Sequence, residues 1–381
     1  MTTATAFVES CVETVADSAV AVERRARHRP RAGKLLELLA GKKNILVTTH
    51  QHPDPDALAS GLALCHLLAA KLKGPRIGMS IKGRIGGGIN EMFVRLSNLK
   101  LLPWDDEALK EFDAIVLLDT QPMFAFSPLP PAVTPLAVID HHRGKSRKAL
   151  SNCEFCDVRT DVGATSSIVF SYFMELDVPI KGDLAATLLY AIETDLAGAA
   201  GTPGELDQIA LSSLTLMADP RRLYQMRYVD LPQGYYLAYA TGLANAHYWE
   251  PTGNGTPNNG AVLSHLESID SMEQPAVIAD FLLRFDKVQW ALVTAVHENK
   301  LVLSIRTSSN KLSAADMARK LLRQIGEGGG HKTKAGGFIK LETGSAAEVD
   351  RYREMLRRRY LRALNIKGHR GQRLVPNFPK P

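Results

Sequence analysis

The stretch Val138-Ile139-Asp140-His141-His142 joins an apolar run to an acid and two adjacent histidines. Residues 132–137 before it are almost all apolar or small, which is the pattern of a strand buried in a parallel sheet. Open α/β sheets bind ligands beyond the carboxyl ends of such strands, so the stretch suits a functional site. Taken alone, it is explained equally well by a turn capped by Asp140 and two solvated histidines.

Alternating strand and helix patterns surround this stretch. The alternation predicts an α/β domain whose parallel sheet has helices on both faces. We expect strands at 45–49, 76–81, 114–118 and 136–139, and helices at 57–72, 164–176 and 183–193.

A chain of 381 residues exceeds one ordinary core, so two domains are expected. Residues 206–247 read as helical, and the Gly, Pro and Asn residues of 251–260 indicate a linker or exposed loop. A second, smaller α/β pattern follows, with strands at 261–266, 288–297 and 300–306 and helices at 275–283, 313–325 and 346–364. The predicted layout is a helical N-terminal extension (1–40), a first domain (41–225), a helical linker and loop (226–260), a second domain (261–365) and a basic tail (366–381).

The composition is that of a globular protein with a modest basic excess, 46 Lys and Arg against 40 Asp and Glu. The excess gathers near the chain ends, which indicates either a polyanionic partner or a solvated helix face with a tail. Four cysteines make no disulfide framework, so we expect a cytoplasmic protein, and Cys153 and Cys156 form a CxxC motif without a second pair. No apolar stretch reaches the ~18 residues of a membrane span, so no membrane partner is expected.

A second polar cluster follows the strand expected at 45–49 and contains His50, Asp54 and Asp56. Pro55 favours an extended conformation at Asp54. On an extended backbone, residues two apart point to the same side, so the two carboxylates converge as metal ligands do. The alternative makes Asp56 a helix N-cap and Asp54 a turn residue, which leaves His50 unexplained.

Further acids stand at the ends of other elements of the same domain. Crowded carboxylates repel each other unless cations neutralise them, and mixed imidazole and carboxylate ligands suit Mn²⁺, Fe²⁺, Co²⁺ or Zn²⁺. Two such ions ~3.5–4 Å apart clamp the oxygens of a displacement at phosphorus, so the pattern predicts phosphoester or phosphoanhydride hydrolysis. The expected cluster comprises His50, Asp54, Asp56, Asp119, Asp140, His141, His142 and Asp195.

The second domain contributes a glycine run, Gly328-Gly329-Gly330, followed by His331. Glycines expose backbone N–H groups to phosphate. Arg306, near the end of an expected strand, offers a bidentate guanidinium. These residues are the expected substrate-binding groups.

This ordered set of motifs resembles the DHH phosphoesterase superfamily with its DHH-associated C-terminal domain. The branch it resembles contains the bifunctional nanoRNases and pAp phosphatases and the cyclic-di-AMP or linear dinucleotide phosphodiesterases. The resemblance implies two Mn²⁺ ions, one held by His50, Asp54 and Asp119. It assigns the second to Asp56, Asp119, His141 and Asp195.

The resemblance also implies roles for the remaining groups. A bridging hydroxide attacks, His142 contacts the scissile phosphate or its leaving oxygen, and Asp140 orients the histidines. Arg306, His331 and the glycines grip the terminal phosphate and sugar across an interdomain cleft. Lys334 and the segment after Asp195 depart from the family pattern, which bears on substrate preference.

The expected function is therefore a Mn²⁺-dependent 3′-to-5′ hydrolase of short oligoribonucleotides and dinucleotides that also removes the 3′-phosphate of pAp. The alternatives are a cyclic-di-AMP or linear di-adenylate phosphodiesterase and, from another class, a non-catalytic nucleotide-binding regulator. The resemblance leaves a homodimer open.

Overall fold

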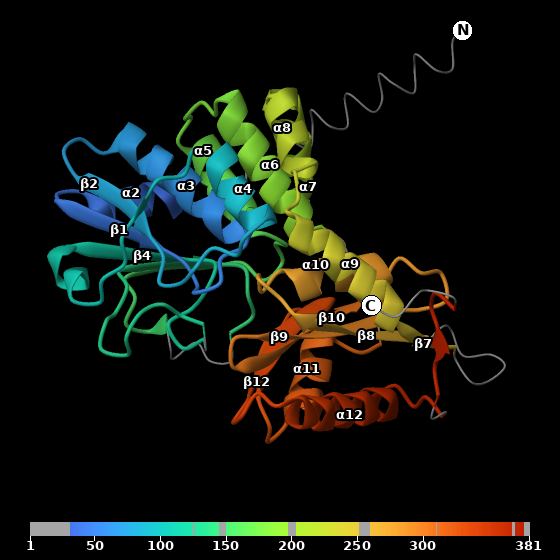
Figure 1. The fold of residues 1–381 in the computed structure, drawn as a ribbon. Coiled ribbons are helices and arrows are strands. Elements are labelled where there is room, and N and C mark those ends of the chain that lie inside the picture. The colour runs from blue at the N-terminus through green and yellow to red at the C-terminus, as the bar shows by residue number, and fades with distance from the viewer. Residues whose placement is uncertain are drawn as a thin grey trace, which may run out of the picture. The chain divides into compact units, whose positions relative to one another are not determined.

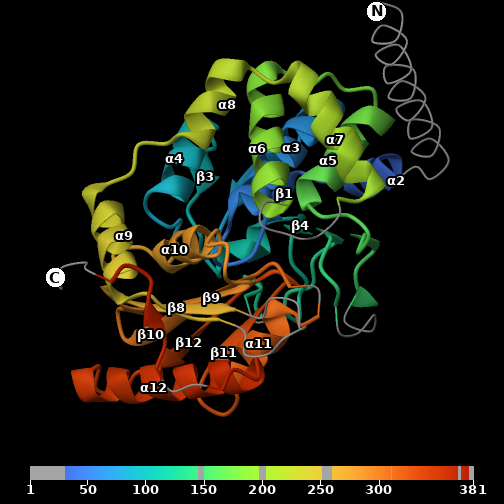
Figure 2. The ribbon, with the colours of Figure 1, turned by 90° about the vertical axis from the view of Figure 1, so that its right-hand side faces the viewer.

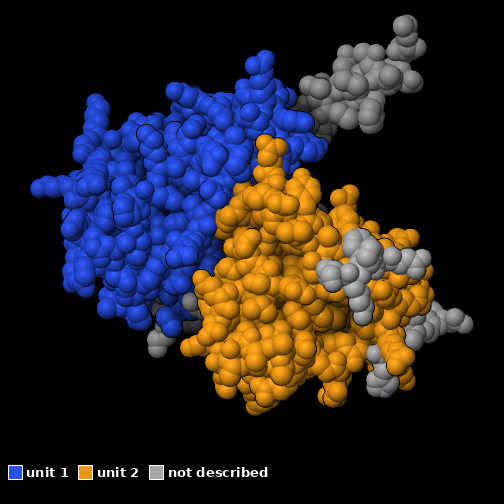
Figure 3. Space-filling model, in the orientation of Figure 1, with its two compact units in different colours: residues 1–85, 90–196, 203–229 blue, residues 86–89, 197–202, 230–381 orange. Residues whose placement is uncertain are grey.

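The computed structural model describes residues 31–124, 126–144, 150–196, 203–250, 260–309, 311–367 and 370–376. The chain divides into two compact units, shown in different colours in Figure 3. Unit 1 comprises residues 1–85, 90–196 and 203–229, and unit 2 comprises residues 86–89, 197–202 and 230–381. The change at 229/230 falls inside the interval that the sequence assigns to a linker.

Unit 1 is built on a six-stranded sheet in which every neighbouring pair is parallel. From edge to edge its strands are β3 (Leu101–Leu102), β2 (Arg76–Ser80), β1 (Asn44–Thr48), β4 (Ala114–Leu118), β5 (Ala137–Asp140) and β6 (Phe155–Val158). The chain leaves β1 toward β2 and later adds β4 on the other side of β1. The strand order therefore reverses between β1 and β4, where open α/β sheets bind ligands.

Helices cover one face of this sheet, as Figures 1 and 2 show. That face presents Ile45, Val116 and Ile139 to a continuous apolar core. On the opposite face, Leu46 and Leu117 pack against a 3-10 helix (Ala108–Glu111) and connecting segments. Among the described residues, this face therefore has much less helix packed on it than the expected layer of helices on both faces. The helices are α2 (Arg31–Leu39), α3 (Pro55–Lys71), α4 (Ile89–Leu96), α5 (Thr165–Glu175), α6 (Gly182–Leu196), α7 (Glu205–Met217) and α8 (Pro220–Arg227).

Unit 2 contains a seven-stranded sheet in which only β8 and β9 are parallel neighbours. Its strands in spatial order are β11 (Glu327–Gly330), β12 (Lys334–Lys340), β10 (Lys300–Thr307), β9 (Trp290–His297), β8 (Ala261–Ser268), β7 (His247–Trp249) and β13 (Gln372–Arg373).

Two pairs of helices sandwich this second sheet (Figure 1). α9 (Gln233–Asn245) and α10 (Gln274–Leu282) pack on one face, and α11 (Ala314–Leu322) and α12 (Ala346–Ala363) pack on the other. Successive residues of β10 point to opposite faces of the sheet. Leu303 and Ile305 pack in the core beneath α11, so Ser304 and Arg306 lie on the face that carries α10.

The α/β fold class and the long elements agree with the sequence-based expectation within about two residues at most ends. The short strands β3, β6, β7, β11 and β13 and helix α4 were not expected. Gln372 and Arg373 lie in the expected basic tail, yet they pair with β7 and extend the sheet. Of the expected extension, α2 is helical and packs on α5 and β6, whereas residues 1–30 lie outside the described residues.

No helix within the described ranges combines the length and the apolar character needed to cross a membrane.

Leu64 tests the contribution of the helical layer to stability. Its side chain lies fully buried in α3, so Leu64→Ala removes apolar contacts and leaves a cavity that costs about 2–5 kcal/mol. We expect the midpoint of thermal unfolding, followed by far-UV circular dichroism, to fall by several degrees. Leu216→Ala in α7, where the side chain is 88% exposed, is the control and should leave the midpoint unchanged. Equal midpoints for both variants would contradict this packing.

Candidate metal centre

Asp119 lies at the centre of a polar cluster in unit 1. It follows β4 directly, is 3% exposed and has a φ of 54°. Aspartate tolerates this left-handed conformation better than most side chains. Its carboxylate lies 3.5 Å from Nε2 of His50, 3.4 Å from Nε2 of His141 and 3.7 Å from Nδ1 of His142. Residues that follow β1, β4 and β5 therefore converge on one carboxylate.

Asp54 and Asp56 approach the cluster from the start of α3. Asp54 is extended, with φ −96° and ψ −179°, as Pro55 predicts, and its Oδ1 caps the helix by accepting from the N–H of Ala57. Asp56 already belongs to the first helical turn, so the expectation that both acids share one extended segment is wrong. The helix nevertheless carries Asp56 to Asp119 and His141, because their candidate ligand atoms lie within 4.8 Å of one another.

The N-terminus of α5 fixes two of these acids. Asp56 accepts hydrogen bonds from the N–H groups of Thr165 at 2.7 Å and Ser166 at 2.8 Å. The hydroxyl of Thr165 donates to Asp119 at 2.8 Å. Thr165 carries no distinctive signal in the sequence, because its hydrogen bond to Asp119 joins segments that lie far apart in the chain. A helix N-terminus also favours the negative charge of Asp56.

Asp140 ends β5 and binds both histidines that follow it. Its Oδ1 accepts from the N–H of His141 at 2.9 Å and lies 2.7 Å from Nδ1 of His142. Its Oδ2 accepts from Nε2 of Gln121 at 2.8 Å, and the same Nε2 bonds the carbonyl of His142 at 3.0 Å. Gln121 is 2% exposed and was missed by sequence analysis, because an amide two residues after an acid has no distinctive pattern.

Asp195, near the end of α6, completes the group that the structure brings together. Its Oδ2 lies 3.6 Å from Nε2 of His141, whose Nδ1 lies 3.3 Å from the carbonyl of Val162. The eight residues expected at this site thus lie close together, because each has a candidate ligand atom within 4.8 Å of one on Asp119, Asp140 or His141. Sets with ligand atoms close enough to share a metal ion include His50–Asp54–Asp119 and Asp56–Asp119–His141.

Electrostatics in this cluster reflect an excess of negative charge. Burial and the charges of Asp119 and Asp195 raise the pKa of Asp56 well above its ordinary value. Burial opposes protonation of His142, but hydrogen bonding to Asp140 and the charge of Asp119 raise its pKa to about 10. For Asp119, burial is outweighed by the hydrogen bond with His50 and the histidine charges, which lower its pKa. The crowded carboxylates need cations to balance their negative charge, and either protonated histidines or bound metal ions can supply that positive charge.

The donor set fits divalent metal ions. Imidazole nitrogens and carboxylate oxygens lie on rigid strand ends and helix termini, and hydrogen bonds from Gln121 and Thr165 already orient the acids. The CxxC motif gives no comparable site: neither Cys153 nor Cys156 joins a metal-like cluster within the described residues. Burial and the neighbouring Cys156 raise the pKa of Cys153 to about 12, which keeps its thiol protonated.

The glycines expected to bind substrate have different surroundings in unit 2. Added Cβ atoms at Gly328 and Gly337 would lie 2.4 and 2.3 Å from Leu322 Cδ1, so packing under α11 excludes side chains there. Gly330 has a φ of 145°, which disfavours other residues. Gly329, by contrast, has open space at its Cβ position. It pairs with Gly336, which in turn pairs with Ser304, so bare backbone borders Ser304.

Arg306 lies on the same sheet face as Ser304, opposite Lys334 of β12. Its Nε donates to Oδ1 of Asp280 at 2.6 Å, and its Nη1 donates to Oγ of Ser304 at 2.9 Å and to the carbonyl of Ile305 at 3.1 Å. His331 is half-buried in the turn between β11 and β12. The structure thus groups Arg306, Ser304 and the open glycines on the side of the sheet that faces α10.

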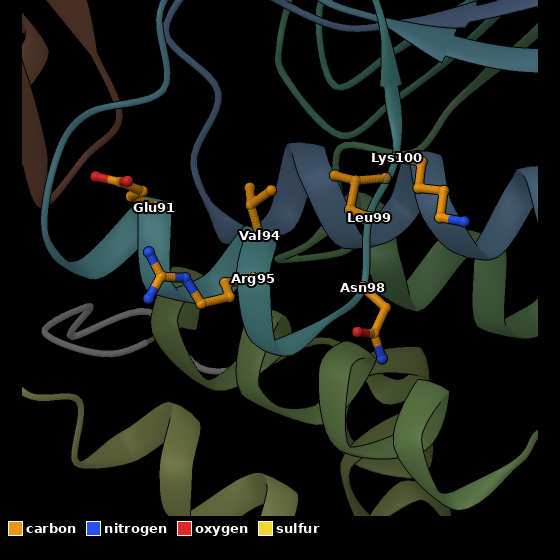
Figure 4. A pocket seen from close by; sticks show the side chains of 6 residues that line it. All are labelled: Glu91, Val94, Arg95, Asn98, Leu99 and Lys100. Carbon is orange, nitrogen blue, oxygen red and sulfur yellow. The ribbon is translucent and has the colours of Figure 1, made fainter.

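A separate hollow of about 370 Å³ lies along α4 (Figure 4). None of its six lining residues belongs to the metal cluster, so it is not the site described above. They are Glu91, Val94, Arg95, Asn98, Leu99 and Lys100.

Comparisons with known proteins agree with this architecture. The family model of the DHH family N-terminal domain matches residues 44–192, and that of the DHHA1 domain matches residues 259–359. The crystal structure of an exopolyphosphatase-related protein from Bacteroides fragilis superposes with a TM-score of 0.66 at 18% identity, covering 88% of this chain and 98% of that one. That likeness shows a shared fold.

Two relatives are similar in sequence. An uncharacterized protein of Methanocaldococcus jannaschii is 28% identical over 331 residues, which cover 86% of this chain and 65% of the relative. A probable manganese-dependent inorganic pyrophosphatase of Bacillus licheniformis is 30% identical over 158 residues, which cover 40% of this chain and 47% of the relative. The chain therefore spans less than two thirds of the length of either relative.

The parallel sheet of unit 1 gathers aspartates and histidines at its switch point, which is the donor set of a divalent metal centre, and unit 2 has a glycine-rich sheet edge. The chain belongs to the DHH superfamily of phosphoesterases and carries the DHH and DHHA1 domains in sequence.

Metal binding should release protons. Burial alone would lower the pKa of His50, but its hydrogen bond to Asp119 and neighbouring charges raise it, and the pKa of Asp56 is also raised. Because a metal ligand must be deprotonated, Mn²⁺ affinity should rise as pH rises through neutrality. Calorimetry of Mn²⁺ binding at pH 7 in two buffers of different ionisation enthalpy measures the release. Identical heats in both buffers would contradict this prediction.

Gln121→Leu should weaken the site without unfolding the domain, because leucine fills similar space but cannot donate to Asp140. Loss of such a supporting hydrogen bond typically costs about 10–100-fold in metal affinity or activity. The checks are Mn²⁺ affinity and the thermal midpoint. Gln208→Leu, at an exposed position of α7, is the control. Wild-type Mn²⁺ affinity in Gln121→Leu would show that Asp140 needs no support from the amide.

Proposed function

We propose that the protein is a Mn²⁺-dependent 3′-to-5′ hydrolase of short oligoribonucleotides and dinucleotides, and that it also removes the 3′-phosphate of pAp. The observation that carries this proposal is the position of Asp119, which has nitrogens of His50, His141 and His142 within 3.4 to 3.7 Å of its carboxylate oxygens. A carboxylate surrounded in this way is suited to bridge two metal ions.

The proposed ligand sets share Asp119. His50 and Asp54 belong to one set, and Asp56, His141 and Asp195 belong to the other. When bound, the metals would lower the pKa of water and neutralise charge that develops on phosphate oxygens. The chain's own part is to hold these ligands on strand ends and helix termini, so that little reorganisation is needed when substrate arrives.

His142 is proposed to contact the phosphate. Asp140 holds its Nδ1 at 2.7 Å, which orients the ring and favours a protonated imidazole. A cationic imidazole can donate to a phosphate oxygen and stabilise the charge that the leaving oxygen acquires. Asp140 has no exposed surface, so its role is to position His142 rather than to touch substrate.

Unit 2 is proposed to bind the rest of the substrate. The bare backbone of Gly329 and Gly336 lets a nucleotide approach closely, and Arg306 and His331 supply donors for phosphate or sugar oxygens. These residues would bind the terminal nucleotide of the substrate, which favours very short oligonucleotides over long strands.

A cyclic-di-AMP or linear di-adenylate phosphodiesterase would use the same metal centre and remains the alternative. The similarity to a pyrophosphatase adds inorganic pyrophosphate to the substrates worth testing. A non-catalytic regulator would be expected to lack one or more metal ligands, whereas all of the expected side chains are here.

A substrate panel tests the proposal. Purified protein with Mn²⁺ is incubated with pApA, pAp, cyclic-di-AMP, a 24-mer RNA and pyrophosphate, and products are separated by chromatography. We expect turnover of pApA and pAp and slow or no turnover of the 24-mer. Turnover of cyclic-di-AMP alone would establish the alternative, and turnover of pyrophosphate alone would refute the proposed substrate class.

Asp119→Asn tests whether the activity depends on this centre. It should lower kcat by at least about a thousandfold, since it removes a charge shared by both proposed metal sets. Asp183→Asn is the matched control, because Asp183 stands at the other end of α6 and its side chain is 66% exposed. Near-normal turnover by Asp119→Asn would refute the bridging role.

A further inference from the structure

Asp280 of α10 forms an ion pair with Arg306 of β10, and both residues belong to unit 2. The carboxylate of Asp280 accepts from Nε of Arg306 at 2.6 Å. The arginine side chain is only 11% exposed, whereas that of Asp280 is 48% exposed. This pair holds the guanidinium at the face that also carries Ser304 and the open backbone of Gly336 and Gly329.

The hydrogen bonds of Arg306 limit what it can offer to a ligand. Its Nε–H is used by Asp280, and the two N–H groups of Nη1 are used by Ser304 and the carbonyl of Ile305. Within the described part of the chain, Nη2 is the nitrogen that makes no hydrogen bond. A two-nitrogen grip on phosphate requires Nη2 together with Nε or Nη1, so the bidentate grip expected from the sequence is blocked in this arrangement.

We propose that Asp280 is a specificity-determining residue that positions Arg306 and restricts it to a single-nitrogen contact with groups of low charge. This deepens the proposed function, on which its link to substrate choice rests. A ligand oxygen bound by Nη2 lies close enough to Asp280 to feel its negative charge. That charge is partly balanced by Arg306, so a singly charged phosphodiester or a ribose hydroxyl is accepted more readily than a doubly charged terminal phosphate.

The nearby groups are consistent with a charge-selective position. Tyr239 of α9 lies near enough for burial and the negative charge of Asp280 to raise its pKa, so its hydroxyl stays neutral. Lys334 is the cross-strand neighbour of Arg306 and adds a positive charge on the same face. Removing the charge of Asp280 would therefore make this part of the sheet face more positive.

Asp280→Asn is the informative change, because asparagine keeps an oxygen that can accept from Nε of Arg306 but carries no charge. Affinities of the full-length protein for 5′-AMP and for adenosine are measured by calorimetry with a chelator present, so that metal does not bind the phosphate. We expect Asp280→Asn to bind 5′-AMP about three- to tenfold more tightly. Adenosine affinity should change less than about twofold, because adenosine carries no phosphate charge.

Two controls separate this role from a structural one. Asp316→Asn alters another aspartate of unit 2 that pairs with an arginine, Arg319, and should change neither affinity. Combining Asp280→Asn with Arg306→Ala should abolish the gain, because Asp280 acts through Arg306. A thermal midpoint within a few degrees of wild type shows that each variant is folded.

The outcomes distinguish this inference from the proposed function. Unchanged or weaker 5′-AMP binding by Asp280→Asn, or no measurable 5′-AMP binding by any variant, would overturn the inference. A selective gain in 5′-AMP affinity supports it even if the substrate panel shows no hydrolysis, in which case only the proposed function fails. Where hydrolysis occurs, Asp280→Asn should raise kcat/KM for pApA relative to ApA by a similar factor.

Discussion

Five buried or half-buried aspartates share a small volume with three histidines at the ends of β1, β4 and β5 and at nearby helix termini. The rest of unit 1 depends on holding that charge in place. Bringing carboxylates together out of water is costly unless each is hydrogen-bonded and cations balance their charge. The fold supplies the hydrogen bonds itself: the start of α5 donates to Asp56, Thr165 donates to Asp119, and Gln121 donates to Asp140. Divalent metal ions balance the carboxylate charge better than protonated histidines, because they carry more charge and coordinate several oxygens at once.

The amino-acid sequence was sufficient for the fold class, the long elements and the residues that converge on Asp119. These rest on local signals: apolar runs that stop at an acid, Pro55 before a helix, and a glycine run before a histidine. Short strands such as β3 and β13 could not be foreseen, because two residues carry no period and pair only when a neighbouring strand is present. Gln121 and Thr165 were missed for a related reason, since their importance arises from contacts between segments far apart in the chain.

In unit 2, too, contacts between distant segments could not be predicted from the sequence. The sequence indicates a glycine run and an arginine, but it does not distinguish glycines required by packing, such as Gly328 against Leu322, from those that leave backbone open, such as Gly329. It also gives no sign that Asp280, 26 residues before Arg306, would occupy the guanidinium. In the proposed function, selectivity between related phosphoesters depends on such tertiary contacts, whereas the proposed metal ligands lie next to strand ends and helix termini.

Anomalous diffraction from crystals of the Mn²⁺-bound protein, recorded at the manganese edge, tests the central claim most directly. The account predicts two peaks about 3.5–4 Å apart with the carboxylate of Asp119 bound to both. A single peak, or peaks that do not contact Asp119, would contradict it.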